Sequence, residues 1–290
     1  QSSSKKSQNT QVIPHILTMS ATPIPRSLML TIFSHLEISI LDEMPFGQKP
    51  IETWLTPQTK RLDGYRWIGQ QLEKKPNNLA LVVCPFIDPS DHEAFTDVKA
   101  ATQVHQELEK LLSNQPSIKL ALLHGRQKKA KQEKIIKQLY SKKINLLVTT
   151  TIVEVGVDLP QANIISIESA DRFGLASLHQ LRGRVGRQGQ QSYCLLFSSS
   201  GGEATRKRLK LFAQETNGIK LAEQDLKNRG AGDLFGTRQS GLDELRFASW
   251  TNLELISLAR KIALKIKTQN LDWKPLIEPT TDHNTKVAAN

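Results

Sequence analysis

The sequence contains only two cysteines and no long hydrophobic segment. Cys84 and Cys194 both lie in apolar runs, and neither belongs to a Cys-x-x-Cys pair or to a Cys/His cluster. This arrangement predicts two buried thiols in a reducing compartment and gives no indication of a metal site. No apolar run approaches the roughly 20 residues that a membrane-spanning helix needs, and no signal-peptide pattern is visible.

Acidic residues are scarce, and a phosphate loop is absent. The 290 residues include 28 Asp and Glu against 39 Lys and Arg, so the formal net charge is +11. A basic balance of this size favours a polyanionic partner. The pattern G-x-x-x-x-G-K-[S/T], the glycine-rich loop that wraps nucleotide phosphates, occurs nowhere in the sequence.

Hydrophobic runs alternate with helical patterns over the middle of the chain. The runs that read as buried strands are 79–83, 118–124, 144–150, 164–168 and 192–197. Between them lie two amphipathic helices, one with Val104, Leu108 and Leu112 on a single face and a basic one over residues 128–140. The alternation predicts an α/β fold in which helices flank a parallel sheet and ligands bind at the carboxyl ends of the strands.

Three charged or glycine-rich segments follow these strands or lie in the connecting loops, so we expect them at the carboxyl ends. They are "HGR" (124–126), "TTTIVEVGVD" (149–158) and "RGRVGR" (182–187). Glycine destabilises a helix by about 1 kcal/mol relative to alanine, so Gly183 and Gly186 argue against a solvated helix face for the last segment. Its arginines are expected to reach an anion across closely approaching backbone.

The last third of the sequence favours helices. Two short helices are expected at 203–215 and 219–228, with Gly218 as a helix C-terminal cap between them. A glycine-rich basic segment follows at 229–241, and a final amphipathic helix covers about 251–267.

Four stretches carry a resemblance to a known family. "SATPIPR" (20–26), "TTTIVEVGVDLP" (149–160) and "QLRGRVGR" (180–187) resemble motifs three, five and six of superfamily-two helicases. "LAEQDLKNRGAGDLFGTRQSGLDELRFA" (221–248) resembles the translocation region of the RecG family and of the transcription-repair coupling factor, and its ending looks like RecG in particular. The resemblance covers roughly residues 12–265.

The resemblance implies a division of the chain into four parts. Residues 1–48 would be a remnant of a first RecA-like motor domain, and residues 49–198 the second RecA-like domain. Residues 199–268 would form a helical hairpin with the translocation motif, and residues 269–290 a loose tail.

The resemblance also implies a nucleotide site that uses ATP with Mg²⁺, held mainly by an N-terminal half that this sequence lacks. Arg184 and Arg187 correspond to arginine fingers that face the γ-phosphate, and Gln180 would orient them. Arg182 is expected to be a structural salt-bridge partner. The other residues implied at the nucleotide are Gly156, Asp158 and Gly183.

Branched or forked double-stranded DNA is the substrate that the resemblance implies. Phosphate contacts position DNA without reading its sequence, and hydroxyls, amides and cations suit them. An alternative for Arg126 and Lys128 is the solvated start of a basic helix, and Asp225 and Asp233 are expected to bind arginines in the closed state of the motor. The implied DNA and translocation residues are Ser20, Thr22, His124, Arg126, Thr149, Thr150, Arg229, Arg238 and Gln239.

The implied function is that of an ATP-dependent DNA helicase which remodels stalled replication forks and Holliday junctions in recombination and repair. The protein would be a monomer in the bacterial cytoplasm, associated with the nucleoid, and this chain would not hydrolyse ATP alone. Two alternatives stay open: a transcription-repair coupling factor motor fragment and a non-enzymatic DNA-binding module. The "TRQSGLDELRFA" ending (237–248) disfavours the first, and the finger arginines disfavour the second.

Overall fold

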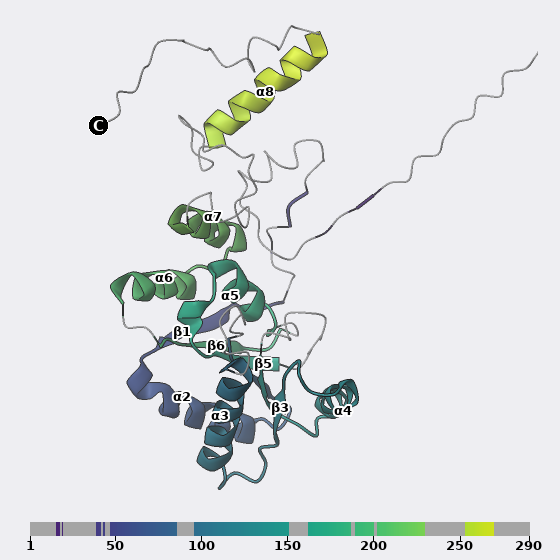
Figure 1. Ribbon diagram of the computed structural model, residues 1–290, viewed down its shortest axis with the longest axis vertical. Helices are drawn as coiled ribbons and strands as arrows, with labels where there is room; N and C mark the ends of the chain where they lie inside the picture. Colours follow the sequence, from purple (N-terminus) through teal and green to yellow (C-terminus); the bar gives the residue numbers. More distant parts are fainter. Residues whose placement is uncertain are drawn as a thin grey trace, which may run out of the picture.

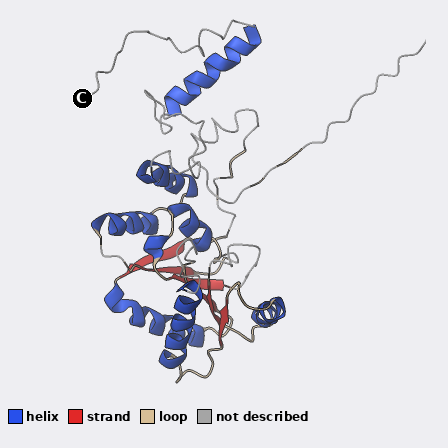
Figure 2. Ribbon diagram, viewed as in Figure 1, coloured by secondary structure: helices blue, strands red, loops and turns tan. Residues whose placement is uncertain are grey.

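A computed structural model gives the fold as one parallel sheet with helices on both faces (Figures 1 and 2). The structure describes residues 16, 17, 19, 39–41, 43, 47–85, 96–150, 162–186, 189–199, 202–229 and 253–269. The described strands are β1 (Ile51–Thr56), β2 (Leu79–Val83), β3 (Leu120–Leu123), β4 (Leu146–Thr149), β5 (Ala162–Ile167) and β6 (Ser192–Phe197). Their order is β1-β6-β5-β2-β4-β3, with every neighbouring pair parallel, which confirms the predicted fold class.

The described helices match the periodic segments of the sequence closely. They are α2 (Arg61–Lys74), α3 (Thr96–Leu111), α4 (Lys129–Tyr140), α5 (Leu175–Arg182), α6 (Glu203–Gln214), α7 (Gly218–Arg229) and α8 (Leu253–Gln269). Short 3₁₀ turns occur at η1 (Gln58–Lys60) and η3 (Ala170–Arg172). Among the described residues, no helix is both long and apolar enough to cross a membrane.

The inner strands β6, β5, β2 and β4 are buried on both faces because helices cover both sides of the sheet (Figure 1). Along β5, Ile165 and Ile167 pack with the side chains of α4 to α7, whereas Ile164 packs with those of α2 and α3. Strands buried in this way read as continuous apolar runs rather than alternating ones. Their sequence runs therefore predicted β2 and β6 with the correct bounds.

The edge strand β1 and the helices α2 and α5 are absent from the strand and helix predictions. The segment "IETWLT" alternates between exposed and partly buried residues, so it offers no apolar run. In the structure, the ring of Trp54 packs against Trp67 of α2 and Tyr193 of β6, with centroids 5.1 and 5.3 Å apart. These aromatic contacts, made between elements far apart in sequence, hold the first strand at the edge of the sheet.

Gly218 does not cap the end of α6, as the sequence suggested. The helix α6 ends at Gln214, and Gly218 is the first residue of α7. The Asn217 side chain accepts hydrogen bonds from the backbone N–H groups of Ile219 and Lys220, at 2.9 and 3.2 Å. A side-chain oxygen that satisfies these N–H groups is the usual N-cap, so the turn starts a helix instead of ending one.

The end of α4 contains an unusual lysine. The N–H of Lys142 donates to the carbonyl of Leu139, and that of Lys143 donates to the carbonyl of Gln138. This pair of bonds is the Schellman motif, which normally places glycine where Lys142 has a φ of 57°. A side chain in the left-handed region strains the backbone, so the fold alone gives no reason for a lysine here.

We expect Lys142→Gly to stabilise the protein by up to about 1 kcal/mol, because the relief of the left-handed strain exceeds the added flexibility of the unfolded chain. Ser141→Gly is the matched control, since Ser141 has an ordinary φ of −82° and gains nothing from glycine. Urea unfolding of both variants measures the difference. A loss of stability in Lys142→Gly equal to that in Ser141→Gly would contradict the strain argument.

Candidate nucleotide and nucleic-acid site

The described parts of the predicted site segments lie at two opposite edges of the sheet. The carboxyl edge is formed by the strand ends Thr56, Val83, Leu123, Thr149, Ile167 and Phe197, and the amino edge by the strand starts Ile51, Leu79, Leu120, Leu146, Ala162 and Ser192. His124 and Arg126 follow β3 at the carboxyl edge. Leu123 pairs with Thr149 of the neighbouring strand, so the "HGR" loop lies beside the end of β4, as predicted.

Two glutamines that the sequence reasoning missed shape the "HGR" loop. The Gln132 side-chain amide lies within hydrogen-bonding range of the carbonyls of His124, Gly125 and Gln127, at 3.3, 3.2 and 2.9 Å. The Gln127 side chain donates to the Leu122 carbonyl at 3.0 Å. These bonds satisfy the loop's carbonyls internally, and Arg126 is exposed to solvent. The loop is therefore a preformed turn that presents a cation.

Thr149 and Thr150 are buried, with exposed fractions of 0% and 1%. The Thr149 hydroxyl donates to the Thr150 carbonyl at 2.9 Å, and the Thr150 N–H donates to the Leu123 carbonyl at 3.4 Å. In this conformation neither threonine presents its side chain at the surface. Their contact with DNA phosphates stays a prediction, and it requires the Thr149 hydroxyl to exchange its partner.

A partly buried ion-pair cluster also lies at the carboxyl edge, and no pattern in the sequence indicated it. The Glu168 carboxylate, directly after β5, accepts from Arg61 Nε at 2.9 Å and from the Tyr65 hydroxyl. Arg61 also donates to Glu107 of α3 at 2.8 Å. Burial opposes the charge on Arg61, but its neighbours Tyr65 and Glu168 outweigh burial, so the pKa of Arg61 is raised. The cluster anchors α2 and α3 to the end of β5.

The arginine segment lies at the amino edge, contrary to the expectation that all three segments gather at the carboxyl ends. It follows α5, which begins beside the end of β5 and runs back along the sheet. The N–H of Gly186 donates to the carbonyl of Ala162, the first residue of β5, at 3.3 Å. A right-handed crossover returns the chain to the start of the next strand, so a segment placed just before β6 must reach the amino edge.

Gly183 and Gly186 lie in different structural environments. Gly183 is exposed at the end of α5 and has an ordinary φ of −68°. Gly186 is buried with a φ of +83°, and a Cβ there would lie 3.3 Å from Ile51 Cγ1 and 3.4 Å from Ser192 Oγ. The close approach of Gly186 is thus to the sheet itself and not to a nucleotide. Gly183 is the glycine of the pair that faces solvent.

Arg182 is buried and has an exposed fraction of 4%. Its guanidinium donates to the carbonyls of Phe212 and Glu215, at 3.0 and 2.9 Å, and lies 4.3 Å from the centroid of the Phe212 ring. Among the described residues no carboxylate forms a salt bridge with it. The expected structural role is thus filled through backbone carbonyls at the end of α6, not through an ion pair.

The helix α7 supports α5 at both ends. Asp225 accepts a hydrogen bond from the N–H of Leu175 at 3.4 Å, at the N-terminus of α5, where a negative charge is favourable. Near the other end, a Cβ on Gly218 would lie 2.6 Å from His179 Nε2, so the imidazole packs directly on the start of α7. In this structure Asp225 binds a helix terminus, and its expected contact with arginines in the closed state stays a prediction.

The loop that enters α5 is fixed by further side chains. Asp171 accepts from the N–H and hydroxyl of Ser199, at 2.7 and 2.9 Å. Burial opposes ionisation of this carboxyl, but the Ser199 bonds outweigh burial and lower the pKa of Asp171. Arg208 of α6 donates to the carbonyls of Asp171 and Phe173 at 2.7 and 2.6 Å. The position of α5, and so of Arg184 after it, is determined from several sides.

Some of the remaining predicted residues lie in the described part of the chain and the others lie outside it. Gln180 and Arg184 are partly buried at and after the end of α5, and each has an interaction partner. Arg229 is the last residue of α7. The predicted residues outside the described part are Ser20, Thr22, Gly156, Asp158, Arg187, Asp233, Arg238 and Gln239. Within the described part, no group of three or more His, Cys, Asp or Glu residues is arranged to hold a metal ion.

We expect Gly186→Ala to destabilise the protein by about 1–2 kcal/mol, because alanine is strained at a φ of +83° and its Cβ meets Ile51. Gly183→Ala is the matched control. Its Cβ would lie no closer than 3.4 Å to the Gln180 carbonyl, so its stability should change by less than about 0.5 kcal/mol. Thermal unfolding measures both. Equal losses in the two variants would show that the arginine turn does not require the left-handed glycine.

Stability should also fall below about pH 6.5 through His179. Burial first, and then the charge of Arg182, lower the pKa of His179, whose Nδ1 faces Arg182 NH2 at 3.3 Å. The unfolded chain therefore binds more protons, so the stabilisation is complete above the unfolded pKa of about 6.5 and declines as pH falls toward the lower folded value.

Urea unfolding at pH 7.5 and 5.5 measures this decline. His179→Asn keeps an acceptor beside Arg182 but does not titrate, so its decline should be smaller than that of the unmodified chain. His105 also has a lowered pKa through burial and contributes to both proteins alike. Identical declines in the two proteins would exclude His179 as a cause.

Known proteins with similar sequences share this domain. Residues 63–189 match the family model of the helicase conserved C-terminal domain. The chain is 39% identical over 257 residues to the ATP-dependent DNA helicase RecG of Thermotoga maritima, covering 88% of this chain and 32% of that protein. It is 41% identical over 266 residues to the ATP-dependent DNA helicase RecG of Synechocystis, covering 90% of this chain and 31% of that protein.

A solved structure of RecG bound to a three-way DNA junction has the same fold. Its TM-score with this chain is 0.61 at 39% identity, over 74% of this chain and 27% of that one. The chain spans about a third of the length of the curated relatives that it matches. With its parallel sheet, its flanking helices and this identity along most of its length, the chain carries a RecA-like helicase C-terminal domain and is similar to the corresponding part of RecG helicases.

Proposed function

We propose that this chain is the part of an ATP-dependent DNA helicase that supplies the arginine fingers and the DNA-translocation elements. The observation that carries the proposal is the fixed position of α5: the segment with Arg184 directly follows a helix that α6 and α7 hold at both ends. The RecG structure with a three-way junction supports branched DNA as the substrate. Stalled replication forks and Holliday junctions, in recombination and repair in the bacterial cytoplasm and nucleoid, are the proposed setting.

The proposed nucleotide side is the amino edge. Phosphoryl transfer depends mainly on positioning and on stabilisation of charge, which a planar guanidinium provides through paired N–H donors. Arg184 and Arg187 are the proposed fingers, with Gln180 orienting them and Gly183 beside the nucleotide. Gly156 and Asp158 are proposed near the ribose and the cleft. ATP and Mg²⁺ would be held mainly by the N-terminal half of the helicase, which has the phosphate loop that this sequence lacks.

The proposed DNA side begins at the carboxyl edge. Arg126 is exposed on a turn that Gln127 and Gln132 hold in shape, which suits a contact with a phosphate. His124 lies in the same turn, and Thr149 lies beside it. The other proposed DNA and translocation residues are Ser20, Thr22, Thr150, Arg229, Arg238 and Gln239.

We propose that α5 links the two sides. The helix runs from the carboxyl edge, where Asp225 of α7 caps it, to the amino edge, where Arg184 follows it. A shift of the arginine segment on contact with nucleotide would therefore move α7, which leads into the translocation residues that begin at Arg229. Within this scheme, residues 1–48, 49–198, 199–268 and 269–290 keep the domain roles that the sequence predicted, and the protein acts as a monomer.

The test is ATP hydrolysis in the presence of forked DNA, by this chain alone and mixed with the N-terminal half of a RecG helicase. Activity is expected only in the mixture. Arg184→Ala or Arg187→Ala should lower it by about 10³-fold or more, as removal of an arginine finger does. Arg206→Ala removes an exposed arginine of α6 and is the matched control, which should retain full activity.

Three outcomes would count against the proposal. Hydrolysis by the chain alone would show that its nucleotide site is complete. An associated but inactive mixture would favour the non-enzymatic DNA-binding module. Equal activity of the Arg184→Ala and Arg206→Ala mixtures would remove the assignment of Arg184 as a finger.

A further inference from the structure

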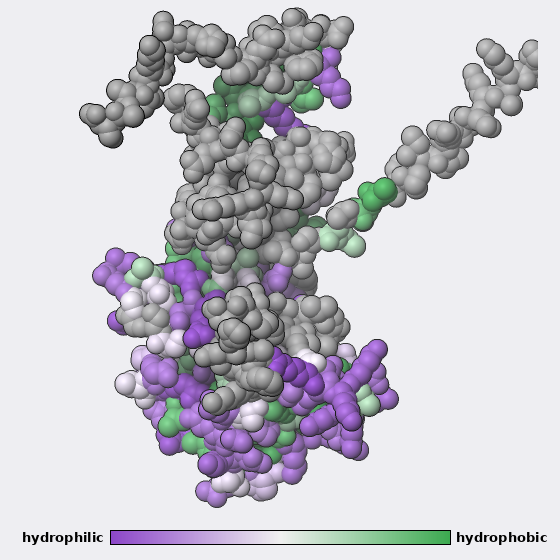
Figure 3. Space-filling view, viewed as in Figure 1, coloured by the Kyte–Doolittle hydropathy of each residue, from purple (hydrophilic) through white to green (hydrophobic). Residues whose placement is uncertain are grey.

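A dense group of exposed lysines covers α4 and the turns at its two ends. These residues are named the α4 basic surface: Lys128, Lys129, Lys131, Lys134, Lys137, Lys142 and Lys143. Between residues 126 and 143 the only acidic side chain is Glu133. Figure 3 shows hydrophilic side chains gathered over α4, on the right of the view.

The charges on this surface are not neutralised within the described part of the chain. No ion pair there joins one of its lysines to a carboxylate. Lys142 donates to the neutral side chain of Asn77 at 3.1 Å, which leaves its charge intact. Lys131, Lys134 and Lys137 follow one another at intervals of three residues, and like charges at that spacing destabilise a helix.

The stability of α4 does not explain these lysines. Lys128 occupies the N-cap position without a side-chain cap, and the first turn holds no acidic residue. Cations near a helix N-terminus are opposed by the partial positive charge of the helix dipole. The packing of α4 on the sheet is provided by Ile135 and Leu139, whereas the lysines are exposed. The lysines therefore have an electrostatic cost that an anionic partner would remove.

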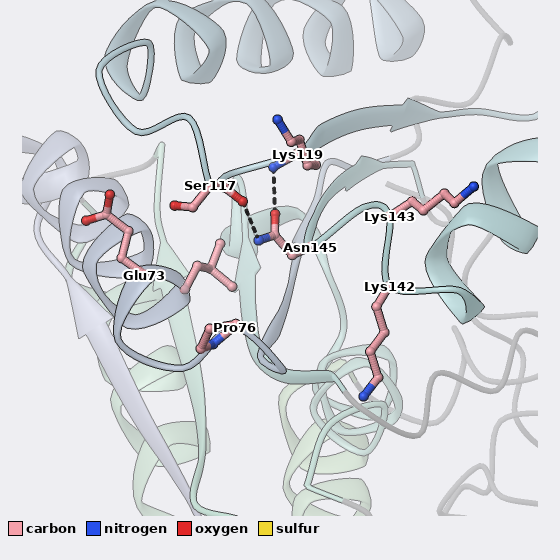
Figure 4. Close-up of a pocket in the computed structure, with 8 residues that line it drawn as sticks. Glu73, Pro76, Ser117, Lys119, Lys142, Lys143 and Asn145 are labelled. Carbon is pink, nitrogen blue, oxygen red and sulfur yellow. Dashed lines mark hydrogen bonds between the residues drawn. The ribbon is translucent and has the colours of Figure 1, made fainter.

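The surface ends at a cavity of about 500 Å³ at the amino edge, whose charged lining residues are three lysines and one carboxylate, Glu73. Lys119, Lys142 and Lys143 line it, and Asn145 shapes it by donating to the Ser117 carbonyl at 3.0 Å and accepting from the Lys119 N–H at 2.7 Å. In Figure 4 the amines of the three lysines point in different directions. Amines that diverge suit an extended row of anions better than one phosphate.

The surface is continuous with the proposed DNA contact at Arg126. The 12 residues of α4 give a length of about 18 Å, which separates Arg126 at one end from the cavity at the other. Double-stranded DNA carries one charge for about every 1.7 Å of its axis, so about ten phosphates on its two strands fall within that length. An extended phosphate backbone therefore matches the surface in both length and charge.

We propose that the α4 basic surface binds the phosphate backbone of double-stranded DNA along the outside of the domain, from Arg126 to the cavity at the amino edge. The inference rests on the proposed function, in which the protein works on DNA. It adds a second path for duplex DNA that leaves the carboxyl edge and follows α4. A surface of this kind binds without regard to base sequence, because it contacts only phosphates.

The test compares two triple variants of the full chain. K131Q/K134Q/K137Q removes three charges from α4, and K110Q/K207Q/K210Q removes three charges from exposed lysines on α3 and α6. Binding to a fluorescent 30-base-pair duplex is measured by anisotropy over a series of NaCl concentrations. The slope of the logarithm of the binding constant against the logarithm of the salt concentration falls in magnitude by about 0.9 for each lost phosphate contact. The α4 variant should therefore lose about 2–3 in this slope and about 100-fold in affinity near 0.1 M salt. The control should lose less than about 3-fold.

Lys142→Gly provides a second and independent measurement. It should weaken duplex binding several-fold, while its melting temperature stays the same or rises, because glycine suits the left-handed turn. A parallel titration with polyglutamate of matched charge tests whether the surface prefers DNA to an acidic protein. Polyglutamate that binds as tightly as the duplex, with the same loss in the α4 variant, would overturn the assignment to DNA.

The outcomes also separate this inference from the proposed function. Equal slopes for the two triple variants, with DNA-stimulated hydrolysis intact in the mixture of halves, would overturn the α4 path alone. Absence of salt-dependent duplex binding by the unmodified chain, together with an inactive mixture, would overturn both.

Discussion

The buried guanidinium of Arg182 is the interaction on which the arrangement of the site depends. A buried charge is costly unless it is hydrogen-bonded, and here two carbonyls at the end of α6 and the face of Phe212 receive it. These contacts fasten the end of α5 to α6. Arg184 lies two residues after Arg182 and two before Gly186, which turns the chain onto the sheet. The positions of Arg182 and Gly186 therefore determine the position of Arg184.

The two ends of helix α5 lie at opposite edges of the sheet. Its N-terminus lies at the carboxyl edge, where Asp225, Arg208 and the bonds of Asp171 fix the entering loop. Its C-terminus lies at the amino edge, where the arginine segment starts. A single helix thus joins the two edges, and in the proposed function this arrangement would give a physical route between a nucleotide and DNA.

The buried and the exposed residues of α4 have different effects on its stability. Ile135 and Leu139 pack in the core, whereas the exposed lysines oppose the stability of the helix. Lys142 adds backbone strain to the same region. Features that cost stability and have no compensating contact in the described structure are the ones that point most directly to a partner, because the partner removes the cost.

Periodicity in the sequence was sufficient for five of the six strands and most of the helices, because local patterns record burial, and the motifs indicated the similarity to RecG helicases. It missed β1, α2 and α5, and β1 is a half-exposed strand that the ring contacts of Trp54 with distant partners hold in place. Only the tertiary structure decided that the arginine segment lies at the amino edge, that Arg182 binds carbonyls 30 and 33 residues away, and that Glu168 pairs with Arg61 across 107 residues. The physical reason is that these bonds join elements whose proximity is created by the crossovers of the sheet, and no local pattern in the chain encodes it.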